Sequence, residues 1–150
     1  MTNDESDRQE RLGKLCVLIL RGRAAHQVND RAAWKASYYR KLLASGRHKK
    51  WTEFELERKI ESARLGLMRT QEQLKNLMAE TVEQLSSLRV SLAISFFYNE
   101  KNQIDGMWLP HAPSRPHDGI KVDMEGIQVI ADQYEANKAL STVLEDNNES

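Results

Sequence analysis

The sequence predicts a mostly all-α protein, a helical bundle or hairpin that contains one long, coiled-coil-like helix over about 52–97. Two observations predict this class. No proline occurs from the start of that segment to Pro110, and its apolar residues recur in alternating steps of four and three, as in coiled coils. Such a helix spans roughly 69 Å, whereas a compact domain of 150 residues is roughly 40 Å across. We therefore expect the helix to protrude, to pair with another helix, or to break.

The composition supports one helix-rich domain with a projecting element, since 29% of the 150 residues are charged and 40% are hydrophobic. The apolar run Leu15–Leu20 is too short for a signal peptide or a membrane span. We therefore expect a cytoplasmic protein without membrane association. The single cysteine, Cys16, lies in this run, which predicts a buried and inert thiol.

The N-terminal part predicts a first helix over 7–26. Ser6 and Gln9 have the spacing of a capping box, in which two side chains satisfy free amide groups of the first helical turn. The apolar run inside this segment is also compatible with a buried strand, because periodicity alone does not separate the two.

A second helix is predicted over 31–44. Asn29 or Asp30 is a suitable N-cap, and Ser45 with Gly46 is a suitable end. A short basic linker then leads to the long helix.

The long helix begins at a second capping box, Thr52 and Glu55, and carries one apolar seam. The predicted partner or oligomer seam consists of Ile60, Leu67, Leu74, Met78, Leu85, Leu88 and Leu92. Two interpretations fit it equally well: a dimeric coiled coil, or a bundle helix that packs on the first two helices. We expect Leu85→Asp together with Leu88→Asp to dissociate or unfold the protein.

The C-terminal part predicts less regular structure. The segment 95–98 could form one strand of a short hairpin closed at 99–102, with a further extended piece near 120–122. All three prolines lie in 110–119, which predicts an exposed connector. Asp123 is a suitable cap for a last helix. These signals divide the chain into a helical domain 1–109, a proline-rich connector 110–122, and an acidic helix and tail 123–150.

The charge is distributed unevenly along a chain whose formal net charge is zero. Segment 21–50 has nine cations and one acid, whereas segment 101–150 has four cations and nine acids. Such asymmetry indicates an anionic partner, or attraction between the two segments.

Aromatic residues interleave with the cations of the basic segment, a combination that single-stranded nucleic acid binders use. The possible anion or nucleic-acid contacts are Arg31, Lys35, Arg40, Lys41, Arg47, Lys49 and Lys50. Because Trp34, Tyr38 and Leu42 recur every four residues, we expect these aromatic side chains to be buried in the core, which would leave the cations exposed.

No motif for catalysis, for a cofactor or for a metal is recognised, so we predict neither an enzyme nor a cofactor. His111, His117 and Asp118 supply at most three metal donors in a proline-rich loop, too few for a predicted site.

Two functions remain. The first is a non-enzymatic interaction protein, an adaptor, regulator or inhibitor that binds itself or another protein through the long helix. The second is a nucleic-acid-binding regulator that uses segment 21–50 and whose acidic C-terminal part masks it. The sequence favours the first, because helical stripes require packing partners whereas opposite charges can be satisfied within one chain. If masking occurs, deletion of 124–150 should strengthen nucleic-acid binding.

Overall fold

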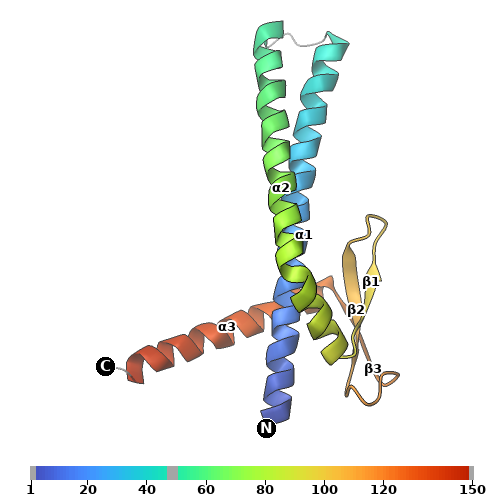
Figure 1. Cartoon of the computed structure of the whole chain (residues 1–150), viewed down its shortest axis with the longest axis vertical. Coiled ribbons are helices and arrows are strands. Elements are labelled where there is room, and N and C mark those ends of the chain that lie inside the picture. The colour runs from blue at the N-terminus through green and yellow to red at the C-terminus, as the bar shows by residue number, and fades with distance from the viewer. Residues whose placement is uncertain (1–2, 47–50, 149–150) are drawn as a thin grey trace. The chain divides into compact units, whose positions relative to one another are not determined.

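The computed structural model describes residues 3–46 and 51–148, and it confirms the mostly all-α class with a small β-structure. The elements are, in order, α1 Asn3–Ser45, α2 Glu53–Ser91, β1 Ser95–Tyr98, β2 Ile104–Pro110, β3 Gly119–Asp123 and α3 Met124–Asn148 (Figure 1). No helix in the described part of the chain has an apolar stretch long enough to cross a membrane.

The chain forms two compact units, which are described separately below. The helical hairpin consists of residues 22–80, and the sheet unit consists of residues 1–21 with 81–150. The boundaries that the sequence suggested after residues 109 and 122 both fall inside the sheet unit, where β2 and β3 are paired.

The expectation of two helices before residue 45 is wrong, because α1 is continuous from Asn3 to Ser45. No proline or glycine interrupts the chain between 23 and 45. Asn29, expected as an N-cap, instead lies against α2, with its Oδ1 3.1 Å from the Thr70 hydroxyl. The predicted end of this helix is confirmed, since Gly46 has a left-handed φ of 68° and donates its N–H to the Leu43 carbonyl.

The predicted start of the long helix is confirmed. The Thr52 amide donates to Glu55 Oε2 at 3.2 Å, and the Glu55 amide donates to Thr52 Oγ1 at 3.1 Å, which is a complete capping box. The predicted cap of the last helix is confirmed as well, because the Gly126 amide donates to Asp123 Oδ1 at 2.8 Å.

The long helix ends at Ser91, six residues before the predicted Phe97. Ala93 adopts a left-handed φ of 55°, and the Ile94 amide donates to the Arg89 carbonyl at 3.0 Å. This is a Schellman-type end with alanine where glycine is usual. The buried Ile94 side chain holds the chain in this conformation and directs it into the sheet.

The sheet has three antiparallel strands in the order β1-β2-β3. The predicted hairpin is confirmed: Ser95 pairs with Trp108, and the turn is closed by the Asn99 amide, which donates to the Gln103 carbonyl. The proline-rich segment is the loop between β2 and β3, which begins after buried Pro110 and ends where Gly119 pairs with it.

The sheet unit contains most of the buried side chains of the described chain. α1, α2, the strands and α3 all contribute to its core, which consists of Leu15, Cys16, Ile19, Leu88, Leu92, Ile94, Met107, Val122, Ile127 and Ala131. Burial raises the pKa of the Cys16 thiol to about 12, because the thiolate would lose its hydration. The thiol is therefore protonated at neutral pH, as expected for a structural cysteine.

The hairpin, in contrast, has a thin core. Its buried apolar residues within the described segments are Ala36, Leu56 and Ala63. Two of these are small alanines, one on each of the helices that run side by side in Figure 1, whereas larger side chains such as Trp34 and Leu65 are exposed.

Two glycines of α1 are expected to respond oppositely to alanine. A Cβ on Gly13 would lie 2.5 Å from the Tyr134 Cβ of α3, whereas a Cβ on Gly22 would meet nothing within 4 Å. We expect Gly22→Ala to raise the free energy of unfolding by about 0.5–1 kcal/mol through helix propensity. Gly13→Ala should lower it by about 1–2 kcal/mol, because overpacking outweighs that gain. Urea denaturation of both variants tests this, and a stabilised Gly13→Ala protein would contradict the α1–α3 contact.

Candidate functional site

The aromatic residues of the basic segment lie on the surface of the hairpin, so the expectation of core burial is wrong. Trp34 is 68% exposed and Tyr38 is 42% exposed. Their rings are stacked, with centroids 5.3 Å apart and planes inclined by 11°. The four-residue spacing does place the two rings on one helical face. That face is directed away from α2, because α1 packs on α2 through the face that contains Ala36.

The stack belongs to a longer series of rings, here called the aromatic row: Trp34, Tyr38, Tyr39 and Trp51. The Tyr39 ring makes edge contacts with Tyr38 at 5.5 Å and with Trp51 at 6.0 Å between centroids. Lys59 Nζ of α2 lies 4.9 Å from the Trp51 ring centroid and 5.8 Å from that of Tyr39. These cation–π contacts fix the inner end of the row to α2 and leave Trp34 at its exposed end.

The cations predicted to bind anions are exposed where the structure describes them. Four are on α1, namely Arg31, Lys35, Arg40 and Lys41, while Arg47, Lys49 and Lys50 lie outside the described residues. Residues 31–45 include no acid. Within the described segments none of the four pairs with a carboxylate. Their charge is therefore available to a ligand.

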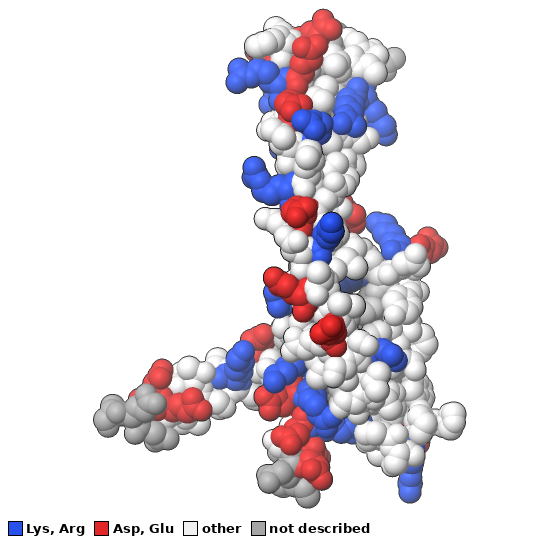
Figure 2. Space-filling view, viewed as in Figure 1, with Lys and Arg blue, Asp and Glu red and all other residues white. Residues whose placement is uncertain are grey.

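The two units have opposite charge by sequence. Residues 22–80 include thirteen cations and seven acids, a net charge of +6, and the rest of the chain has nine cations and fifteen acids, a net charge of −6. Six of the seven acids of the hairpin lie on the α2 side, at 53–80. Figure 2 shows acidic side chains as a red column on one face of the hairpin, with Lys and Arg on both sides.

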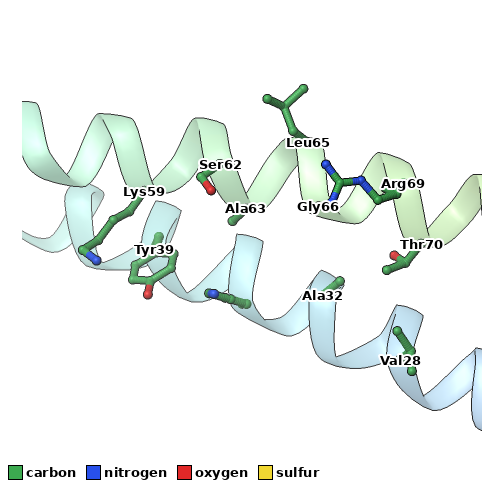
Figure 3. Close-up of a pocket in the computed structure, with 11 residues that line it drawn as sticks. Val28, Ala32, Tyr39, Lys59, Ser62, Ala63, Leu65, Gly66, Arg69 and Thr70 are labelled. Carbon is green, nitrogen blue, oxygen red and sulfur yellow. The ribbon is translucent and has the colours of Figure 1, made fainter.

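A groove runs between α1 and α2 within the hairpin, with a volume of about 540 Å³. We call it the basic groove, and its lining is Val28, Ala32, Lys35, Tyr39, Lys59, Ser62, Ala63, Leu65, Gly66, Arg69 and Thr70. Three of these residues are cations and none is an acid. Figure 3 shows Lys59 extending from α2 towards Tyr39, whereas Leu65 points away from α1.

Sequence reasoning missed Lys59 and Arg69 as possible anion contacts. Both lie on α2, in a segment whose cations and acids are nearly balanced. They line the same groove as Lys35 only because α2 folds back along α1. The capping box at Thr52 after the Gly46 turn was a signal for such a hairpin, but the register between the helices could not be read from it.

The predicted seam is divided between the two units. Ile60, Leu67 and Leu74 are half-buried in the hairpin, and Met78 is exposed. Leu88 and Leu92 are in the core of the sheet unit, and Leu85 packs against it. Most of the stripe thus already has a packing partner inside its own chain.

The histidine cluster does not converge on a site. His111, His117 and Asp118 lie exposed in the β2–β3 loop, where the His111 amide donates to the Asp118 carbonyl at 2.8 Å. No group of three His, Cys, Asp or Glu residues suited to a metal ion occurs among the described residues. Comparison of the chain with protein-family models, curated proteins and solved structures found no match.

Proposed function

We propose that the protein is a non-enzymatic binding protein whose helical hairpin binds single-stranded nucleic acid. The observation that carries this proposal is the exposed Trp34–Tyr38 stack, flanked by cations without carboxylate partners in the described segments. Exposed aromatic faces stack on unpaired bases, and cations beside them contact phosphates.

The surroundings of Trp34 favour a nucleic acid over an apolar partner. A protein interface of ordinary composition has an aromatic centre from which charged residues are depleted. Here Arg31 lies three residues before Trp34 and Lys41 lies three residues after Tyr38, so both cations neighbour the stack on its helical face. Bases with phosphates satisfy both kinds of side chain at once.

Binding of another protein, or of a second copy, through α2 is the second candidate. Leu65, Met68 and Met78 are exposed large apolar side chains on the hairpin part of α2 and favour it. The sequence favours this function because the apolar stripe needs a partner, but much of the stripe is packed within its own chain, in the hairpin and in the core of the sheet unit. Static light scattering distinguishes a monomer from an oligomer.

Fluorescence anisotropy of a labelled single-stranded 20-mer, titrated at several salt concentrations, tests the proposal. If Arg31, Lys35, Arg40 and Lys41 contact phosphates, the logarithm of the association constant should fall with the logarithm of salt with a slope of roughly −3. A duplex of the same length should bind more weakly, because its bases cannot stack on Trp34. Absence of binding at low salt, or equal binding of the duplex, would contradict the proposal.

Masking by the acidic C-terminal part, in a cytoplasmic regulator, is proposed as the means of control. Ile127 and Ala131 are buried in the core of the sheet unit, so deletion of 124–150 would remove packing as well as charge. Deletion of 139–150 removes three acids and, among its described side chains, only exposed ones. Tighter oligonucleotide binding by this shorter protein would support masking, and unchanged binding would exclude it.

A further inference from the structure

We propose that the basic groove holds part of the sugar-phosphate backbone of the bound strand, where Lys35, Lys59 and Arg69 contact phosphates in addition to the cations on the outer surface of α1. This inference rests on the proposed function and adds a second part to the site. The aromatic row would bind bases, and the groove would bind consecutive phosphates.

The charge of the groove is the first argument. Its three cations come from two helices, and no acid lines it. Lys35 and Arg69 have no carboxylate partner among the described residues, and Lys59 contacts the aromatic rings of Tyr39 and Trp51. Lys59 and Arg69 are ten residues apart on α2, about 15 Å along the helix, so the cations spread positive charge along the groove rather than at one point. Such a basic groove attracts an extended anion.

The shape of the groove is the second argument. Ala32, Ala63 and Gly66 form part of its lining, and a Cβ on Gly66 would meet nothing within 4 Å. These small residues let a ligand approach the helix backbones closely. Ser62 and Tyr39 add hydroxyl groups that can donate to phosphate oxygens.

The end of the groove at Val28 is fixed by a contact between the two helices. The Thr70 hydroxyl has two acceptors within reach, the Leu67 carbonyl at 3.0 Å and Asn29 Oδ1 at 3.1 Å. The groove walls are therefore held together near Arg69 before a ligand binds.

Continuity with the aromatic row is the third argument. Tyr39 belongs to both, since it lines the groove and contacts Tyr38 and Trp51. Lys35 lines the groove and follows Trp34 in sequence. The groove and the Trp34–Tyr38 stack lie on neighbouring faces of α1, and Tyr39 joins them, so a strand in the groove would pass Tyr39 to place bases on the stack.

The test compares two triple variants that lower the charge of the hairpin equally. The groove variant is Lys35→Gln, Lys59→Gln and Arg69→Gln. The matched control is Arg58→Gln, Arg64→Gln and Lys75→Gln, three cations of the hairpin that do not line the groove. Both are titrated with a labelled single-stranded 20-mer and with an abasic 20-mer, which has the phosphates without the bases. Circular dichroism and melting temperature establish that both variants fold.

We define the salt slope as the slope of the logarithm of the association constant against the logarithm of the salt concentration. For the groove variant we expect this slope to become less negative by about 2 for both oligonucleotides. The affinity at 0.1 M salt should fall about 100-fold. The control should keep a slope within about 1 of the original, because general charge acts weakly compared with direct contacts. Equal losses of affinity and of salt dependence in the two variants would contradict the proposal that the groove binds phosphates.

The abasic strand separates this inference from the proposed function. If the wild-type protein binds both strands with equal affinity and the groove variant binds both more weakly, phosphate binding in the groove is supported and stacking of bases on Trp34 is contradicted. If the wild-type protein binds the strand with bases more tightly and the groove variant has the same affinity as the control variant, base stacking is supported and phosphate binding in the groove is contradicted. If neither strand binds at low salt, both are overturned.

Discussion

Leu88→Asp is expected to unfold the sheet unit, with a loss of about 4 kcal/mol or more in the free energy of unfolding. Leu88 is 9% exposed and belongs to the core formed with Leu15 and Ile127. Truncating a buried leucine costs about 2–5 kcal/mol, and a carboxylate placed there has no partner. A loss of this size is comparable to the entire stability of a small domain.

Val90→Asp is the matched control, because Val90 lies two residues further along α2 and is 64% exposed. It should change the free energy of unfolding by less than about 0.5 kcal/mol. Urea denaturation followed by circular dichroism, together with light scattering, measures both variants. A folded Leu88→Asp protein that has only changed its oligomeric state would show that Leu88 serves an interface between chains.

The parts of the fold that follow from single polar or glycine residues could be predicted from sequence. Thr52 with Glu55, Asp123 and Gly46 each mark a helix end through bonds to adjacent backbone, and all three ends are where they were expected. Such signals are local, so they do not depend on how the rest of the chain packs.

The parts that depend on tertiary contacts could not be predicted. Asn29 is a good N-cap in isolation, yet its side chain lies against Thr70 and α1 continues through it. Ala93 gave no signal of a helix end, because alanine seldom adopts a left-handed conformation unless neighbouring packing holds it there.

The candidate site was predicted in composition but not in arrangement. The basic segment and its aromatic residues were identified, whereas burial of Trp34 and Tyr38 was expected from their four-residue spacing. Periodicity shows that residues share a helical face, but it does not show which face meets the partner helix. Here the strip with Ala36 and Ala63 forms the contact, since small side chains allow the helices to approach.

Trp34→Ala together with Tyr38→Ala is expected to weaken binding of a single-stranded oligonucleotide at least 30-fold. Stacking contributes about 1–3 kcal/mol per base, so two rings account for about 2–6 kcal/mol. The salt slope should stay the same, because neither residue is charged and the phosphate contacts remain. Since both side chains are exposed, the free energy of unfolding should change by less than about 1 kcal/mol.

Phe54→Ala is the matched control for this variant, because Phe54 is an exposed aromatic residue of the same hairpin outside the aromatic row. The decisive measurement is fluorescence anisotropy of the labelled single-stranded 20-mer with the wild-type, double-variant and Phe54→Ala proteins at one salt concentration. The account predicts a large loss of affinity for the double variant and wild-type affinity for Phe54→Ala. Equal affinities of all three proteins would contradict the claim that the hairpin binds single-stranded nucleic acid through its exposed aromatic stack.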